Sequence, residues 1–217
     1  MEHDPLSRGF AMNAPVGISD PSQLPSIEWE RFIPPLNQGN RGSCVGNAMV
    51  GLLASAPFCR SQVEAVGYNQ DLAVNLYSLA TKLDRFPGSY PPDDTGSTGN
   101  AVAKAARRLG LITSWNWTFS VLAFLSTLQR QPVIVGIPWY ESMYAPDAMG
   151  VVKAEGDIAG GHEFVVNGWD RENELIICWN SWDVTYGAGG KFFIPLETWR
   201  ELHDQAADVT IPIRVSA

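Results

Sequence analysis

The hydrophobic period of this 217-residue chain changes at Pro132, and that change limits its possible folds more than any other feature of the sequence. Before Pro132 the apolar residues recur every three or four positions, as in helices with one buried face. After it, short apolar runs divided by Gly, Asp and Asn indicate strands at residues 133–137, 164–166, 175–178 and 192–194. This segregation predicts an α+β fold with a helical lobe, a sheet or barrel lobe, and a site between the two.

Four helices are expected in the first half of the chain. They cover residues 45–56, 72–83, 102–109 and 121–128. The second should end near Phe86, before Pro87 and Gly88, and the third has Ser97 or Thr98 as its cap and Gly110 as its stop. Residues 89–99, rich in Pro, Asp, Gly, Ser and Thr, read as a loop of the kind that lines a binding groove.

The chain is predicted to consist of an irregular N-terminal arm and one domain. Residues 1–22 are rich in Pro, Ser, Asp and Gly and show no periodicity. Residues 23–217 are long enough for one large core or for two lobes that share a cleft. Within them, the helical part is expected at about 40–130 and the β part at about 131–217.

A glycine-rich polar loop, Asn37-Gln38-Gly39-Asn40-Arg41-Gly42-Ser43-Cys44, leads into the first helix. It delivers a cysteine to the first turn, where unpaired backbone N–H groups favour the nucleophilic thiolate. Gly39 and Gly42 allow the backbone to approach a ligand closely. Taken alone, the stretch is compatible with redox, metal-binding or structural roles.

A cysteine nucleophile needs a base, and the chain has only three histidines. His3 lies in the arm, and His203 is expected on the surface of a late helix. His162 follows Gly160-Gly161 and opens an apolar strand, so a flexible backbone gives way to a rigid element where an imidazole could be held. Its position alone fits a functional and a structural histidine equally well.

An orienting group for that base is offered by Asn180, which lies between Trp179 and Trp182. Its amide could accept the second imidazole N–H while an indole shields the bond from water. A tryptophan beside an asparagine also occurs in ordinary packing, so this segment is informative only in combination with the others.

Composition and charge exclude several classes of function. Fifteen basic against twenty-three acidic residues give a net charge of −8, which argues against a nucleic-acid partner. The three cysteines, Cys44, Cys59 and Cys178, have neither zinc-site spacing nor an even count, so we expect no metal, no cofactor and no disulfide scaffold. The acidic start lacks an apolar signal region and no apolar run reaches membrane-spanning length, so no signal peptide, transmembrane segment or membrane partner is expected.

Together these segments resemble the papain family of cysteine peptidases. Three family patterns are met, by Gln38-Gly39-Asn40-Arg41-Gly42-Ser43-Cys44, by Gly160-Gly161-His162 before an apolar strand, and by Asn180-Ser181-Trp182 before glycines and an aromatic strand. The order Gln, Cys, His, Asn also agrees. Looser similarity includes Tyr77, Asp84 and Asp94-Thr95-Gly96-Ser97, covers residues 25–215, and is nearest to bacterial or viral members without a full prodomain.

The resemblance implies a papain-like two-lobe fold, with a helical left lobe, an antiparallel β-barrel-like right lobe and the active site in the cleft between them. It makes Cys44 the nucleophile, His162 the general base and acid, Asn180 the group that orients His162, and Gln38 an oxyanion-hole donor. By the same resemblance, the substrate-binding residues are Gly96, Gly161 and Trp182. Trp182 also covers the bond between Asn180 and His162.

Five positions depart from the family pattern, among them Tyr186, which stands where the family has a tryptophan before a glycine. The family's usual cysteine is replaced by Arg41, so its common disulfide cannot form, which fits a reducing compartment. Val45 replaces an aromatic residue, Glu163 a small residue and Asp183 a glycine. The two carboxylates are expected to place negative charge near the site and to stabilise an imidazolium.

The resemblance implies a cysteine endopeptidase or related thiol hydrolase that acts on a peptide or protein substrate through an acyl-enzyme, in the cytoplasm or associated with a virion. Acyl transfer or isopeptide cleavage would use the same residues. The alternative is a catalytically silent papain-like binding or structural module within a larger assembly, with a protein partner. It is favoured by the altered residues around the site and opposed by the complete set of Gln, Cys, His and Asn.

Overall fold

Five α-helices and eight strands make up the part of the chain described in the computed structural model, which is residues 11–13, 17–205 and 207–214. The helices are α1 (Cys44–Leu53), α2 (Gln70–Ala80), α3 (Gly99–Arg108), α4 (Val121–Leu128) and α5 (Leu196–Asp204). The strands are β1 (Ala11–Met12), β2 (Ile27–Glu28), β3 (Ser114–Thr118), β4 (Val133–Tyr140), β5 (Ile158–Asp170), β6 (Leu175–Trp179), β7 (Lys191–Pro195) and β8 (Asp208–Ile213). The predicted α+β class is confirmed.

The helices of the first half begin where the sequence places them. Thr98 caps α3 by accepting a hydrogen bond from the Ala101 N–H at 3.2 Å, and Gly110, with φ of +73°, follows its end. The helix predicted to run to Phe86 ends earlier, at Ala80, because the following residues turn back on it and bond its last carbonyls. All four predicted helices are thus present, and two of them end earlier than expected, α1 at Leu53 and α2 at Ala80.

The strands form a single sheet in the order β1-β3-β8-β4-β5-β6-β7, and β2 pairs with β5. The pairings are antiparallel except that of β1 with β3. The four strands expected after Pro132 are confirmed as β4 to β7. The sequence analysis missed β3 and β8, because neither is a continuous apolar run and β8 contains Pro212.

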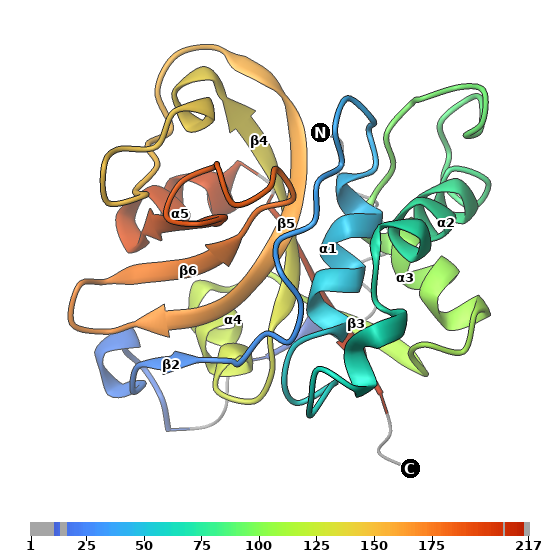
Figure 1. Ribbon diagram of the computed structural model, residues 1–217. Coiled ribbons are helices and arrows are strands. Elements are labelled where there is room, and N and C mark those ends of the chain that lie inside the picture. The colour runs from blue at the N-terminus through green and yellow to red at the C-terminus, as the bar shows by residue number, and fades with distance from the viewer. Residues whose placement is uncertain (1–10, 14–16, 206, 215–217) are drawn as a thin grey trace.

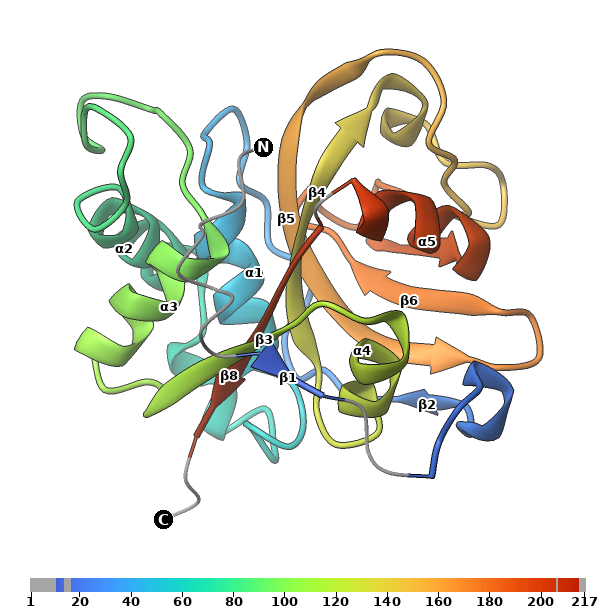
Figure 2. The ribbon, with the colours of Figure 1, turned by 180° about the vertical axis from the view of Figure 1, so that it is seen from behind.

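Two hydrophobic cores lie on opposite faces of the central strands. Figures 1 and 2 show α1, α2 and α3 on one side of β4 and β5, with β6 and α5 on the other. Alternate residues of β5 contribute to each core: Phe164 packs with the sheet-side core and Val165 with the helical core. Helix α4 belongs to the sheet-side core, although it precedes Pro132 in the chain.

The segment before α1 is attached to the body of the protein at several points. β1 pairs with β3, and a 3₁₀ helix, η2 (Pro21–Gln23), is closed by a capping box from Asp20. The Trp29 indole N–H donates to the carbonyl of Leu128 at 2.8 Å and so attaches this segment to the end of α4. The rest of the predicted irregular arm, residues 1–10 and 14–16, lies outside the described residues.

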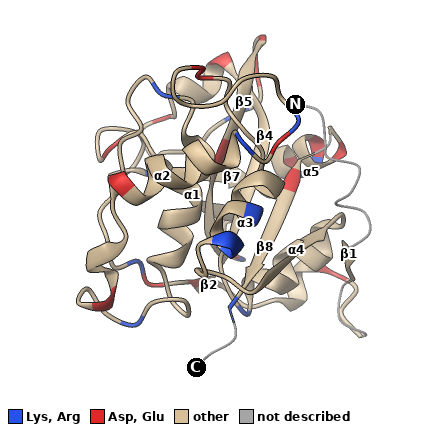
Figure 3. Ribbon diagram, turned by 90° about the vertical axis from the view of Figure 1, so that its right-hand side faces the viewer, with Lys and Arg blue, Asp and Glu red and all other residues tan. Residues whose placement is uncertain are grey.

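Charged residues are distributed over several elements. Figure 3 shows Lys and Arg positions scattered among helices and loops, with two at the end of α3. No helix within residues 11–13, 17–205 and 207–214 is long and apolar enough to cross a membrane.

Candidate active site

A cleft of about 350 Å³ brings the predicted site residues together. On its helical side lie Gln38, Gly42, Cys44 and Thr95–Ser97, and on its sheet side Trp139, Tyr144, Gly160–His162 and Trp182. All three substrate-binding residues expected from the sequence, Gly96, Gly161 and Trp182, are therefore in its walls. Of the four expected catalytic residues only Asn180 lies outside the lining, since it stands behind His162.

Cys44 is the first residue of α1, which confirms its predicted position at a helix start. Ser43 is the N-cap but makes no side-chain capping bond, so the first turn keeps backbone N–H groups without an intrahelical partner. The Cys44 side chain is 9% exposed and its sulfur accepts a hydrogen bond from the Glu163 backbone N–H. The sulfur thus lies against the residue that follows His162.

His162 is held by Asn180 through a hydrogen bond of 2.7 Å between Nε2 and Oδ1. The Asn180 Oδ1 also accepts the Ser181 backbone N–H at 2.8 Å, and that donor fixes which side-chain atom is the oxygen. Because an amide oxygen only accepts, Nε2 must carry the proton of the neutral ring. The unprotonated nitrogen is then Nδ1, which is the atom a base needs.

Two indoles enclose the imidazole. The Trp182 ring centroid lies 4.6 Å from that of His162, with an interplanar angle of 32°. The Trp139 centroid lies 4.7 Å from it, with an interplanar angle of 70°. His162 itself is 4% exposed, and this burial lowers its pKa to about 4 against the opposing effect of the Asn180 hydrogen bond. Trp182, which was expected to cover the bond between Asn180 and His162, thus contacts the imidazole, and Trp139 is a second contact that the sequence analysis missed.

Trp139 went unnoticed because it stands at the end of an apolar strand, where an aromatic residue looks like core. It is 1% exposed and makes edge contacts with Trp182, Phe164 and Phe192 as well as with His162. No short-range pattern distinguishes such a residue from an ordinary core tryptophan.

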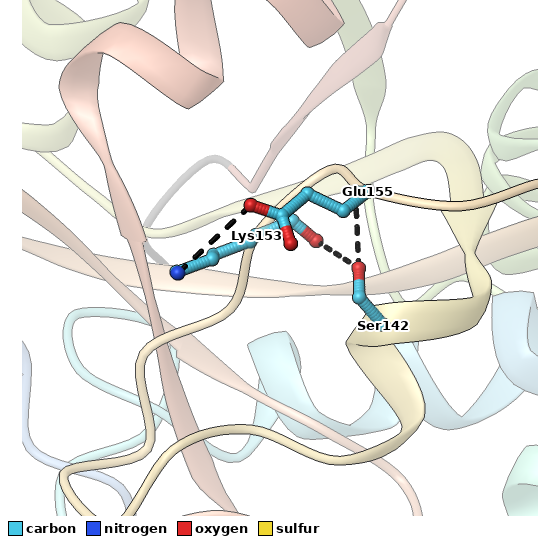
Figure 4. Close-up of polar contacts among 3 residues, drawn as sticks. All are labelled: Ser142, Lys153 and Glu155. Carbon is cyan, nitrogen blue, oxygen red and sulfur yellow. Dashed lines mark hydrogen bonds and ion pairs between the residues drawn. The ribbon is translucent and has the colours of Figure 1, made fainter.

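Tyr144 extends the aromatic wall toward the surface. Its ring stacks on that of Trp182, with the centroids 5.4 Å apart and an interplanar angle of 10°. Tyr144 belongs to the 3₁₀ helix η4 (Glu141–Tyr144), which follows β4. Figure 4 shows how that helix is tied to the next loop: the Ser142 hydroxyl donates to the Lys153 carbonyl at 2.6 Å and accepts the Glu155 N–H at 3.0 Å. Lys153 and Glu155 also form an exposed ion pair at 3.9 Å.

Gln38 is fixed by contacts on both ends of its amide. Its Oε1 accepts the Ser181 hydroxyl at 2.6 Å and its Nε2 donates to the Arg41 carbonyl at 2.8 Å. An amide nitrogen has two N–H donors, so one remains for a ligand in the cleft. The sequence analysis did not anticipate Ser181 as the residue that orients Gln38.

The expectation that the helix start favours the Cys44 thiolate is wrong for the resting site. Burial, and after it the nearby Glu163 carboxyl, raise the pKa of the Cys44 thiol to about 12. The hydrogen bonds from the backbone N–H groups lower the pKa but do not compensate for the lost hydration. With the pKa of His162 lowered, thiol and imidazole are both neutral at pH 7.

The expected negative charge of Glu163 near the imidazole is also wrong. Its side chain points to the helical face of β5, where burial and the nearby Asp208 carboxyl raise the pKa of Glu163 well above its ordinary value. Glu163 and Asp208 flank Gly136 in neighbouring strands. Neither Glu163 carboxyl oxygen has a hydrogen-bond partner within the described part of the chain.

Asp183 occupies the place of the family glycine with φ of +70°. Asp is one of the few non-glycine residues that adopt this left-handed conformation. Its side chain accepts the Val184 N–H at 2.5 Å, so the turn after Trp182 keeps its shape without glycine.

Gly96 lies in the cleft wall with φ of +71°, a conformation that favours glycine. Its N–H is already engaged, because it donates to the Tyr77 hydroxyl at 3.1 Å. This N–H is therefore not free to donate a hydrogen bond to a peptide in the cleft.

The remaining cysteines, Cys59 and Cys178, are both buried. Cys59 is 1% exposed and Cys178 is fully buried, and all three cysteines are free. No cluster of His, Cys, Asp and Glu able to hold a metal occurs in the described ranges.

Several solved structures resemble this chain at low sequence identity. Xylellain, a cysteine protease from Xylella fastidiosa, matches with a TM-score of 0.72 and 16% identity over 95% of this chain and 92% of its own. Digestive procathepsin L 3 of Tenebrio molitor matches with a TM-score of 0.65 and 14% identity, over 95% of this chain and 75% of its own. The Carica candamarcensis cysteine protease CMS1MS2, solved with E-64, matches with a TM-score of 0.57 and 16% identity, over 88% of this chain and 99% of its own.

No protein-family model and no curated protein sequence matches the chain. The structural similarities establish a papain-like fold, as expected from the sequence motifs. At these identities they establish the fold alone.

Proposed function

We propose that this chain, which has the papain-like fold, is a cysteine endopeptidase or related thiol hydrolase with Cys44, His162, Asn180 and Gln38 as its catalytic residues. The observation that carries the proposal is the 2.7 Å bond from His162 Nε2 to Asn180 Oδ1 behind a cleft that contains Cys44. That bond leaves Nδ1 as the basic nitrogen. The ligand is a peptide or protein chain.

In the first step, His162 Nδ1 takes the proton from Cys44 Sγ as the sulfur attacks the scissile carbonyl carbon. The Asn180 oxygen stabilises the positive charge that develops on the ring. Proton transfer accompanies attack, because the thiol and the imidazole are both neutral in the resting site.

The reaction also requires two hydrogen-bond donors for the oxyanion of the tetrahedral intermediate. The free Nε2–H of Gln38 and the backbone N–H of Cys44 at the start of α1 supply them. When the tetrahedral intermediate collapses, His162 returns its proton to the leaving amine and a thioester remains on Cys44. Water, deprotonated by His162, hydrolyses that thioester and restores the thiol.

The alternative function is a silent papain-like module that binds a protein partner without cleaving it. The raised pKa of Cys44 favours this alternative, because it removes the pre-formed thiolate. The intact bond between His162 and Asn180 opposes it.

Labelling with an epoxide inhibitor of papain-like enzymes separates the two. For a peptidase, we expect one adduct per chain, mapped by mass spectrometry to Cys44 and absent from Cys44→Ala, together with hydrolysis of a fluorogenic peptide library. The matched control is Cys59→Ala, which removes a cysteine that does not line the cleft and should label like wild type. Absence of both adduct and hydrolysis would reject the peptidase.

A further inference from the structure

The helical wall of the cleft contains a loop, residues 94–97, that is held at both ends by side chains. At one end the Ser97 hydroxyl donates to the Asp84 carboxylate at 2.6 Å. At the other end the Asp94 carboxylate accepts hydrogen bonds from Gly42 and Tyr77. Thr95, Gly96 and Ser97 line the cleft opposite His162, so the position of this loop sets one side of the opening.

Asp94 connects the loop to two other segments. Its carboxylate accepts the Gly42 backbone N–H, at 3.0 Å to Oδ1 and 3.1 Å to Oδ2. Its Oδ1 also accepts the hydroxyl of Tyr77, which is fully buried on α2. The same hydroxyl accepts the Gly96 N–H at 3.1 Å, so Tyr77 bonds both ends of a three-residue stretch.

The contact with Gly42 is close enough that a side chain at this position would crowd loop 94–97. A Cβ added at Gly42 would lie 3.0 Å from Asp94 Oδ1 and 3.1 Å from the Gly96 nitrogen. Gly42 stands two residues before Cys44, so the loop rests directly on the turn that delivers the nucleophile. Burial and the hydrogen bond to Asp94 raise the pKa of Tyr77, so its hydroxyl remains a donor at neutral pH.

No covalent bond can replace these contacts. All three cysteines are free, and Arg41 occupies the position beside Gly42 where the resembled family has a cysteine. The two loops of the helical wall are thus joined by hydrogen bonds to a carboxylate, which are stronger than bonds between neutral groups.

We propose that Asp94 is a positioning residue that fixes loop 94–97 against the Gly42 turn and thereby sets the width of the cleft for a bound peptide. The effect of Asp94 on substrate binding rests on the proposed peptidase function, whereas its effect on the position of loop 94–97 is independent of that function. Cys44 is held independently, by α1 and by the Glu163 N–H, so loss of Asp94 changes peptide binding and spares the thiol.

Hydrogen–deuterium exchange tests the loop without any activity. In Asp94→Ala, we expect peptides covering residues 40–43 and 94–97 to exchange about tenfold faster than in wild type, which corresponds to one lost charge-assisted bond. Asp94→Asn should stay near wild type, because its amide oxygen can still accept both donors. Asp93→Ala removes the neighbouring exposed carboxylate and should leave both segments unchanged.

Steady-state kinetics test the cleft. With a fluorogenic peptide cut by the wild type, Asp94→Ala should raise KM about tenfold while kcat stays within about threefold. The rate at which iodoacetamide alkylates Cys44 should not change. Tyr77→Phe, which keeps the buried ring but loses the hydroxyl, should raise KM in the same direction.

Different results would reject the peptidase function and the positioning role of Asp94. A wild type that cleaves no peptide rejects the peptidase, while the exchange data still decide the role of Asp94. Unchanged exchange in Asp94→Ala, or a fall in kcat at constant KM, would overturn the positioning role. An effect of Asp93→Ala as large as that of Asp94→Ala would also overturn the positioning role. The loss of a negative charge, and not the loss of the Asp94 hydrogen bonds, would then explain the result.

Discussion

The two walls of the cleft are built by different physical means. The helical wall consists of glycine-rich turns at residues 38–44 and 94–97, which the Asp94 carboxylate joins by accepting the Gly42 N–H, while the Asp84 carboxylate holds Ser97 at the end of the second turn. The sheet wall is a cluster of aromatic rings around His162 on β4, β5 and the turn after β6. Packed rings hold the His162 side chain in one orientation, whereas hydrogen bonds from a few side chains hold the loop at residues 94–97. The position of the base therefore depends on packing, and the position of that loop depends on a few polar contacts.

Removal of the base should have the largest effect of the changes described here. His162→Ala leaves the aromatic wall without the group that accepts the thiol proton, so we expect kcat/KM for a peptide substrate to fall about 10³-fold or more. His203→Ala is the matched control, since that histidine lies on α5 beside Trp199 and does not line the cleft. Peptide hydrolysis measures both, and equal losses would contradict the assignment.

A smaller effect is expected when the shielding ring is removed. Trp182→Ala should lower kcat about 10- to 100-fold, because water would then compete for the bond between His162 and Asn180. Burial lowers the pKa of His162 to about 4, so exposure should raise it toward the ordinary value of about 6.5.

The imidazole titration, followed by NMR of the ring, measures that shift. Trp115→Ala is the control, because Trp115 is a partly buried tryptophan on β3 and does not line the cleft. An unshifted His162 titration in Trp182→Ala would show that the sheet wall does not control this pKa.

The smallest effect concerns Glu163, which lies where the two walls meet. In the folded chain the pKa of Glu163 is raised well above 4.5 by burial and by Asp208, so the folded state binds a proton that the unfolded state releases. Its contribution to stability is present below about pH 4.5 and is lost as the pH rises toward the folded pKa. Glu163→Gln cannot ionise, so its melting temperature should exceed that of wild type by a margin that grows with pH above 4.5.

Thermal unfolding between pH 4 and pH 8 measures this margin, which we expect to reach a few degrees. Glu172→Gln, an exposed carboxylate in the turn between β5 and β6, should follow the wild-type curve. A Glu163→Gln curve parallel to wild type over the whole range would show that the pKa of Glu163 is not raised in the folded chain.

Local pattern was sufficient for much of the fold. Helix starts such as Thr98 and stops such as Gly110 act through the backbone of their own turn, so they are visible in the sequence. β3 and β8 escaped prediction because their formation depends on pairing with each other, across about one hundred residues of chain.

The sequence predicted that helices lie mainly before Pro132 and strands mainly after it, an order to which β3 and α5 are exceptions, and it placed a cysteine at a helix start, a histidine on a strand and an asparagine after the next strand. Tertiary structure alone decided that Trp139 encloses the imidazole, that Glu163 faces a second carboxyl, and that Asp94 binds the Gly42 turn. These outcomes depend on burial and on contacts between residues far apart in the chain. Burial in turn reversed the expected charge states of Cys44 and Glu163, because the free energy of an ionised group follows its hydration and no local motif records that.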